Sequence, residues 1–343
     1  MKRRSFIKSS AFAGIGVMTS RLSFAQSKKE TVQNGLRVGI IGLDTSHATA
    51  VTRLLNADDP SPDFGGYRVV AAYPHGTREI EERIRSLPGY IEEVKKYGVE
   101  IIESIPELLT KVDVTMLLSN DGRVHMEQAI PVFKAGKPAF INKSVGGTLT
   151  DTFAIYQAAK DYNIPVFSSS SVRYMTNIED IVKNQSIGKV LGAETYSPCY
   201  IEPGLPDFFY YGIHGIEALF AIMGTGCKTT TRIHTPDTDV VVGVWDDNRI
   251  GTFRGLRAET VGYGGHVFGE KGIQSPGEMG AMPALLKNMV KFFRTGIAPV
   301  TPEETLEIYT FMEAADESKR RGGAAVSLAE TRQKALSQLQ KTR

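Results

Sequence analysis

The sequence predicts an α/β protein with a Rossmann-type, doubly wound parallel sheet, followed by a C-terminal α+β domain with a mostly antiparallel sheet. Apolar runs of strand length alternate with helical patterns between residues 36 and 168, as in parallel sheets covered by helices on both faces. From residue 171 onward the segments are longer and rich in β-branched and aromatic residues, which favours antiparallel strands. A length of 343 residues also suits roughly two domains.

The first domain is predicted over residues 36–170. Its predicted strands are 36–42, 67–72, 99–102, 112–119, 138–141 and 165–168. Its predicted helices are 47–56, 78–87, 91–97, 124–135 and 151–162, with one more starting at Pro106. In such sheets, ligands bind outside the carboxyl ends of the strands.

The second domain is predicted over residues 171–343. We expect a strand at 189–196 and a hairpin formed by 240–245 and 250–256, because Asp246, Asp247 and Asn248 between them are turn residues. Helices are predicted at 282–293 and 303–320, where polar and apolar residues recur at helical spacing.

Residues 1–25 have the pattern of a twin-arginine export signal. Arg3 and Arg4 precede a mildly apolar run at 11–18, and Ser23 to Ala25 suit cleavage after Ala25. A membrane anchor is disfavoured, because spanning requires ~20 strongly apolar residues. Residues 26–35 form a polar linker. We therefore expect export by the twin-arginine translocase to the periplasm, in a folded state that carries a tightly bound cofactor.

Composition narrows the function classes. The chain is 41% hydrophobic and 23% charged, with a formal net charge of +2, so it is a well-mixed globular sequence without the basic excess of a nucleic-acid binder. No P-loop, serine elbow or zinc-finger pattern occurs. Cys199 and Cys227 leave one disulfide open as an alternative to two free thiols.

The loop after the first strand departs from the dinucleotide fingerprint G-x-G-x-x-G. Only Gly42 is present, since Asp44 and His47 occupy the second and third glycine positions. The second predicted strand ends at Ala72 and is followed by Tyr73-Pro74-His75-Gly76, without the acid that binds the ribose hydroxyls. An alternative interpretation is that Asp44 and Ser46 only cap the following helix.

Motifs across the rest of the chain resemble the Gfo/Idh/MocA family, named for glucose-fructose oxidoreductase, inositol dehydrogenase and a rhizopine-catabolism protein. The motifs are Ser119-Asn120-Asp121, His125, Ala135-Gly136-Lys137-Pro138, Asn142-Lys143-Ser144, Arg173-Tyr174, the stretch from Gly212 to Glu217, the stretch from Phe268 to Gly272, and Thr301-Pro302-Glu303-Glu304. The resemblance implies NAD or NADP in the first domain and a sugar or cyclic polyol between the domains. It also implies a homo-oligomer.

The resemblance also assigns site residues. Lys143 matches the lysine of the family's Glu-Lys-Pro motif, and His214 matches the histidine that faces the substrate, while Tyr210 stands where the family has an aspartate. A surface lysine and a buried core histidine are the plainer alternatives for the first two. The residues expected to contact the dinucleotide are Gly42, Asp44, Thr45, Ser46, His47, Ser119, Asn120, His125, Asn142, Lys143 and Arg173.

The predicted function is a periplasmic NAD(P)-dependent oxidoreductase that acts on a CH–OH group of a sugar or cyclic polyol, or a redox-assisted lyase or hydrolase on such a substrate. Proton transfer by Lys143 and His214 would accompany hydride transfer. The competing hypothesis is a non-catalytic periplasmic sugar-binding or scaffolding protein that lost dinucleotide binding. A metal held by Asp44, His47 and His125 is an alternative, but we expect a cofactor cleft and no metal.

Overall fold

The computed structural model describes residues 35–258, 261–279 and 282–342. The predicted export signal and almost all of the predicted linker lie outside these residues. Within the described residues, no helix combines the length and the apolar character needed to cross a membrane.

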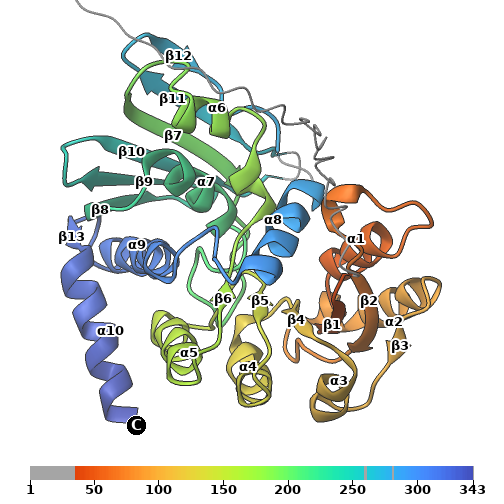
Figure 1. Cartoon of the computed structure of the whole chain (residues 1–343). Coiled ribbons are helices and arrows are strands. Elements are labelled where there is room, and N and C mark those ends of the chain that lie inside the picture. Colours follow the sequence, from red (N-terminus) through yellow and green to blue (C-terminus); the bar gives the residue numbers. More distant parts are fainter. Residues whose placement is uncertain (1–34, 259–260, 280–281, 343) are drawn as a thin grey trace, which may run out of the picture. The chain divides into compact units, whose positions relative to one another are not determined.

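Two sheets organise the described chain (Figure 1). The first is parallel, with strand order β3-β2-β1-β4-β5-β6. Its strands are β1 (Arg37–Ile41), β2 (Arg68–Tyr73), β3 (Glu100–Ile101), β4 (Val114–Leu117), β5 (Ala139–Ile141) and β6 (Val166–Phe167). Its helices are α1 (Ser46–Leu55), α2 (Glu81–Lys95), α3 (Ile105–Lys111), α4 (His125–Lys134) and α5 (Leu149–Asp161). The doubly wound parallel sheet predicted from the alternating pattern is confirmed.

The second sheet has the order β12-β11-β7-β10-β9-β8-β13. Its strands are β7 (Val190–Pro198), β8 (Cys227–His234), β9 (Thr238–Trp245), β10 (Ile250–Leu256), β11 (Gly264–Gly269), β12 (Gly272–Gln274) and β13 (Val326–Ser327). Only the pairing of β7 with β10 is parallel in the described residues, so the sheet is mostly antiparallel as predicted. The β9–β10 hairpin is confirmed.

The remaining helices are α6 (Ile178–Lys183), α7 (Ile213–Met223), α8 (Met282–Thr295), α9 (Pro302–Arg320) and α10 (Leu328–Thr342). Helix α7 is buried on nearly every side, and with α9 it packs against the second sheet. This position makes α7 a rigid support for His214 at its start.

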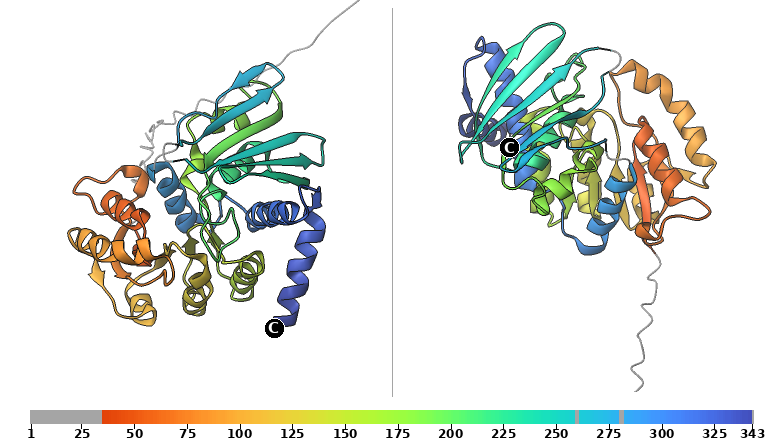
Figure 2. Two further views of the ribbon diagram at one scale, coloured as in Figure 1. Left: turned by 180° about the vertical axis from the view of Figure 1, so that it is seen from behind. Right: turned by 90° about the horizontal axis from the view of Figure 1, so that it is seen from above.

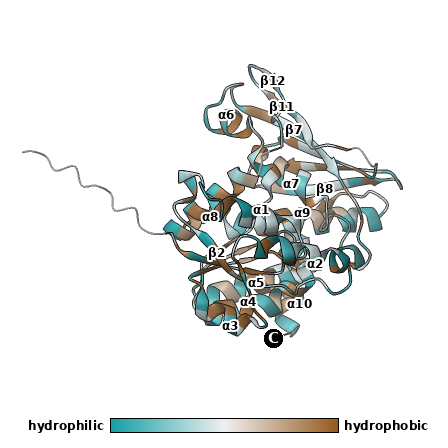
Figure 3. Cartoon of the chain, turned by 90° about the vertical axis from the view of Figure 1, so that its right-hand side faces the viewer, coloured by the Kyte–Doolittle hydropathy of each residue, from teal (hydrophilic) through white to brown (hydrophobic). Residues whose placement is uncertain are grey.

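Helix α8 packs on the first sheet although it follows the second sheet in the sequence. Figures 1 and 2 show it beside α1, and Figure 3 shows hydrophobic and hydrophilic residues alternating along it. Phe292 lies 4.8 Å from Phe167 of β6, centroid to centroid, and Phe293 stacks on Tyr67. The apolar side of α8 therefore completes the core of the first sheet.

Helix α2 differs from its prediction. Two helices, 78–87 and 91–97, were expected on either side of Pro88, whereas one helix runs from Glu81 to Lys95 with Pro88 inside it. A proline costs the hydrogen bond to the carbonyl four residues earlier. That residue is Ile84, which is 44% exposed.

Candidate active site

The carboxyl ends of β1, β4 and β5 bring three loops to one edge of the first sheet. These loops begin at Gly42, Leu118 and Asn142. Because adjacent strands are parallel, loops distant in sequence become neighbours at this edge. Most of the residues predicted to contact the dinucleotide lie on them.

A cavity of about 200 Å³ lies at this edge. Six predicted site residues line it: Thr45, Ser46, His47, Asn120, Lys143 and His214. The first five come from the first sheet's loops and α1, whereas His214 comes from α7. The structure thus brings together an amine and an imidazole that are 71 positions apart in the sequence, between Lys143 and His214.

Lys143 is buried, with 7% of its surface exposed. Its ammonium donates one long hydrogen bond, 3.4 Å, to the carbonyl oxygen of Tyr210. It also lies 5.6 Å from the ring centre of Tyr211, within the range of a cation–π contact. Burial, and then the positive charge of Arg83, lowers the pKa of Lys143 to about 8. An amine with such a pKa exchanges its proton near neutral pH.

The imidazole of His214 forms a hydrogen bond with the hydroxyl of Ser170. Its Nδ1 lies 2.6 Å from Oγ of Ser170, and this hydroxyl also accepts a hydrogen bond from the backbone N–H of Val172 at 3.2 Å. Burial, and then the charge of Lys143, lowers the pKa of His214 well below its ordinary value. The imidazole is therefore neutral at pH 7, with Nε2 left for a ligand.

Glu217, one turn along α7, fixes the segment that carries Ser170. Its carboxylate accepts hydrogen bonds from the Ser169 hydroxyl at 2.7 Å and from the Ser170 N–H at 2.8 Å. Burial raises the pKa of Glu217 to about 7, against the opposing charge of Arg173. Helix α7 thus positions both residues of the contact, because it carries His214 and holds the Ser170 segment through Glu217.

His47 lies at the start of α1, where Thr45 caps the helix by accepting a hydrogen bond from the His47 N–H at 3.3 Å. The imidazole Nδ1 lies 3.3 Å from Oδ1 of Asn142. Burial, followed by the charge of Lys143, lowers the pKa of His47 to about 4. The third glycine position of the fingerprint is therefore occupied by a neutral ring at pH 7.

Asp44 does not cap α1, because Thr45 does. Its Oδ2 accepts hydrogen bonds from the N–H groups of Thr77 and Asn120, at 3.1 and 3.2 Å. The carboxylate thus joins the loops that follow β1, β2 and β4. Its side chain also lines a second cavity of about 410 Å³ beside the end of β2, together with Tyr73, His75 and Arg78 among others.

Three buried polar atoms along this edge have no hydrogen-bond partner within the described protein: Oδ1 of Asp44, Oδ1 of Asn120 and Nδ2 of Asn142. Buried polar groups are nearly always paired, so such a row is typical of a ligand site. Two acceptors and one amide donor suit the hydroxyls and carboxamide of a nicotinamide dinucleotide. The residues present therefore fit this cofactor, despite the missing glycines.

Gly42 and Ser119 belong to the support of the site. Gly42 has a φ of +89°, and a Cβ there would lie 2.2 Å from Oγ of Ser119, so only glycine is tolerated. Ser119 donates its hydroxyl hydrogen to Gln128 at 2.9 Å. The glycine thus allows the β1 and β4 loops to approach each other.

Three other predicted residues do not line the cavity. Both ring nitrogens of His125 lie 3.1 Å from backbone carbonyl oxygens, those of Val145 and Ser119. Arg173 pairs with Glu304 of α9. Tyr210 contacts Lys143 through its carbonyl and accepts hydrogen bonds from Arg83 through its hydroxyl. Among the described residues, no three His, Cys, Asp or Glu side chains are grouped to hold a metal ion.

Several residues of the site were not predicted from the sequence. Arg83, Ser171, Tyr211 and Tyr263 line the cavity, and Ser170 supports His214. The concentration of aromatic residues in the loop from Tyr200 to Tyr211 was a signal for Tyr211, whereas Tyr263 lies outside this loop. Arg83 is one of many charged residues on α2 and carries no local signal.

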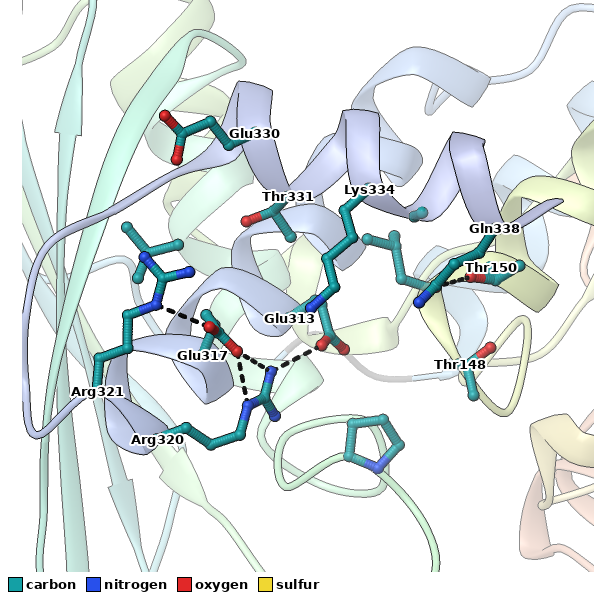
Figure 4. Close-up of a pocket in the computed structure, with 14 residues that line it drawn as sticks. Thr148, Thr150, Glu313, Glu317, Arg320, Arg321, Glu330, Thr331, Lys334 and Gln338 are labelled. Carbon is teal, nitrogen blue, oxygen red and sulfur yellow. Dashed lines mark hydrogen bonds and ion pairs between the residues drawn. The ribbon is translucent and has the colours of Figure 1, made fainter. Parts of the chain in front are cut away.

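A different cavity, of about 320 Å³, lies between α5, α9 and α10 (Figure 4). Its arginines are neutralised by its own acids: Arg320 pairs with Glu313 and Glu317, and Arg321 also pairs with Glu317. None of the predicted site residues lines it. We therefore place the candidate active site at the edge of the first sheet.

The fold is similar to that of solved dehydrogenases. A probable dehydrogenase from Thermotoga maritima has a TM-score of 0.68 and 21% identity, with 86% of this chain and 100% of that chain covered. The scyllo-inositol dehydrogenase from Lactobacillus casei, solved with bound NAD(H) and scyllo-inositol, has a TM-score of 0.68 and 16% identity, over 86% of this chain and 99% of that one. The myo-inositol 2-dehydrogenase from Lactobacillus plantarum has a TM-score of 0.68 and 18% identity, over 85% and 99%.

Comparison of the sequence with protein-family models and with curated proteins finds no match. The structural likeness nevertheless extends over both sheets, so the chain has the fold of the Gfo/Idh/MocA-type dehydrogenases that its motifs resemble. Because fold alone does not fix chemistry, the function rests on the residues of the cavity.

Proposed function

We propose that this protein is an NAD(P)-dependent oxidoreductase that acts on a CH–OH group of a sugar or cyclic polyol. The observation that carries the proposal is the shared cavity of Lys143 and His214, which lies beside the start of α1 and the row of unpaired polar atoms. The similar scyllo-inositol dehydrogenase binds NAD(H) and scyllo-inositol, which supports the same ligand classes here.

The dinucleotide would be held by Asp44, Asn120 and Asn142 through their unpaired atoms, and by the first turn of α1 at Thr45 and Ser46. When bound, nicotinamide supplies a hydride acceptor or donor at the substrate carbon. Arg78 lies by the cavity at the end of β2, but it pairs with Glu127, so NAD and NADP both remain candidates.

Lys143 is the proton-transfer residue in this proposal. With a pKa of about 8, a useful fraction of the side chain is a neutral amine at neutral pH, and this amine takes the proton of the substrate hydroxyl as the alcohol is oxidised. In the reverse direction the ammonium returns the proton to the carbonyl oxygen. Tyr210 supports Lys143 by accepting from its ammonium through the backbone carbonyl.

His214 acts as a hydrogen-bond donor. In this proposal the Ser170 hydroxyl, which accepts from the Val172 N–H, donates its own hydrogen to Nδ1 of His214, the one side-chain acceptor described within hydrogen-bond distance of it. The remaining hydrogen of the neutral ring is then on Nε2. His214 thereby donates to the reacting oxygen and stabilises the charge that develops there. Ser170 takes over the orienting role of the aspartate that Tyr210 replaces.

The first experiment is to purify the chain from residue 26 onward from the cytoplasm, denature it, and identify released small molecules by absorbance and mass. Release of NAD or NADP supports the proposal. A protein without dinucleotide that also gives no calorimetric response to added NAD(P) contradicts it, and favours the non-catalytic binding hypothesis. Product analysis then separates simple oxidation from a redox-assisted lyase or hydrolase.

Location and assembly are further parts of the proposal. The residues of the twin-arginine pattern support export to the periplasm with the cofactor already bound. The second sheet has exposed apolar side chains such as Leu191, Ile233 and Ile250, which supports a homo-oligomer. Size-exclusion chromatography with light scattering measures this state directly.

A further inference from the structure

Arg83 reaches the active-site cavity from α2. Its side chain is only 14% exposed, and it lines the same cavity as Lys143. The guanidinium donates two long hydrogen bonds, both 3.3 Å, to the hydroxyl of Tyr210. Its charge reaches the site, because it lowers the pKa values of both Lys143 and His47.

Neither cation has a buried carboxylate within 4.0 Å among the described residues. The one described carboxylate within 4.0 Å of the Arg83 guanidinium is that of Glu82, at 3.9 Å, and its side chain is 72% exposed. Lys143 donates its one described hydrogen bond to a neutral group, the carbonyl oxygen of Tyr210, at 3.4 Å. None of the described residues that line the cavity carries a carboxylate.

A fully buried arginine of this chain, Arg232, shows the usual arrangement. The Arg232 side chain is 0% exposed and pairs with the carboxylates of Asp207, Asp239 and Asp316. Buried charges are normally compensated in this way, since desolvation of a lone charge is costly. Arg83 and Lys143 lack such a set of carboxylates, and both line the same cavity.

We propose that the substrate carries a carboxylate, as a sugar acid does, and that Arg83 binds this group while Lys143 serves the reacting hydroxyl. The inference rests on the proposed function and narrows its substrate class. A planar guanidinium matches a carboxylate with two parallel hydrogen bonds. The hydroxyl of Tyr210 already holds Arg83 in position, so little ordering is needed when the substrate binds.

The phosphates of the dinucleotide are the other possible source of negative charge. The substrate is favoured because Arg83 contacts the loop that carries Tyr210 and Tyr211, whose rings pack on each other 5.0 Å apart. Tyr211 and Tyr263 both pack edge-on against His214. Arg83 is thus placed among the residues that surround the reacting group.

The test is calorimetric titration of the purified protein at fixed ionic strength. The probes are D-glucuronate and D-galacturonate, each compared with the neutral hexose of the same configuration, and NAD⁺. We expect the uronates to bind about tenfold or more tightly than the hexoses, and Arg83→Met to remove this preference. Arg85→Met, an exposed arginine on the same helix, is the matched control and should retain it. Arg83→Lys should recover part of the preference.

The possible outcomes are distinguishable. Equal binding of uronates and hexoses, or binding of neither, overturns the inference. Weaker NAD⁺ binding in Arg83→Met with an intact uronate preference also overturns it, because the anion is then the dinucleotide's phosphate. If the protein binds no dinucleotide but keeps an Arg83-dependent uronate preference, the proposed function fails while the carboxylate site stands. Circular dichroism confirms that each variant is folded.

Discussion

The hydroxyl of Ser170 lies 2.6 Å from Nδ1 of His214, and both residues are buried. This contact joins the segment after β6, which carries Ser170, to the start of α7, which carries His214. It sets which nitrogen of the imidazole carries the hydrogen, so it determines whether His214 donates or accepts toward a substrate.

Replacing Ser170 by alanine should therefore impair catalysis more than binding. We expect Ser170→Ala to lower kcat by about tenfold to a hundredfold, as the loss of an orienting partner does, with KM and cofactor content nearly unchanged. Ser170→Thr retains the hydroxyl and should recover much of kcat. Ser169→Ala is the comparison variant, because it removes hydrogen bonds to Glu217 and to the Ser170 carbonyl while leaving the Ser170 hydroxyl in place; it should lower kcat less than Ser170→Ala does. Wild-type kcat in Ser170→Ala would remove Ser170 from the mechanism.

The lowered pKa of Lys143 predicts how kcat/KM for the oxidation depends on pH. Because burial and Arg83 lower its pKa to about 8, the amine form is gained as pH rises through that value. The ratio kcat/KM should rise about tenfold per pH unit below the midpoint and level off above it. In Arg83→Met the midpoint should move upward, since a repelling charge is gone. A profile without an inflection between about pH 6 and pH 10 would contradict the assignment of Lys143 as the base.

Lys143→Met removes the titrating group altogether. We expect turnover to be nearly abolished while the dinucleotide content of the purified protein stays the same, because the row of unpaired atoms that would hold the cofactor is intact. Lys134→Met, at the exposed end of α4, is the matched control. Unchanged turnover in Lys143→Met would exclude this residue from the chemistry.

Asp44 is expected to contribute to stability and to cofactor binding. Asp44→Ala leaves the N–H groups of Thr77 and Asn120 without their acceptor, so the free energy of unfolding should fall by about 2 kcal/mol. Urea denaturation measures this, with the exposed Asp58→Ala as the control. Asp44→Asn keeps an acceptor oxygen, and it should show weaker dinucleotide binding with a smaller loss of stability. Undiminished affinity in both variants would exclude Asp44 as a cofactor contact.

The export hypothesis is tested at Arg3 and Arg4, which lie outside the described residues. Replacing both by lysine should stop twin-arginine transport, because that route reads the paired arginines. Cell fractionation and immunoblotting then should find the protein in the cytoplasm. Normal amounts in the periplasm would show that another route exports it.

The order of strands and helices in the first sheet was predictable because each buried strand is an apolar run bounded by turn residues, as 36–42 is. Lys143 and His214 were found through motif order, and the fold then places them in one cavity. Helix α2 was predicted as two pieces, because a proline usually ends or kinks a helix, whereas this helix continues through Pro88.

Arg83 and Ser170 were not predictable from the sequence in the same way. Arg83 meets Tyr210 across 127 positions, and Ser170 meets His214 across 44. Local periodicity and residue spacing do not predict such contacts, because they form only when distant parts of the chain fold together. The same holds for Asp44, whose role as a bridge between loops depends on Thr77 and Asn120 being brought to it.

Because α8 packs on the first sheet, the first sheet cannot complete its core until α8 has been synthesised. Six of its side chains, Leu285, Leu286, Met289, Val290, Phe292 and Phe293, belong to the same apolar core as β1 and β4. A nascent chain that has emerged from the ribosome only as far as β6 lacks α8. One apolar face of its first sheet is then exposed, and chaperones bind such surfaces. The N-terminal half should accordingly be insoluble when produced alone, and it should mature only after Thr295 has been synthesised.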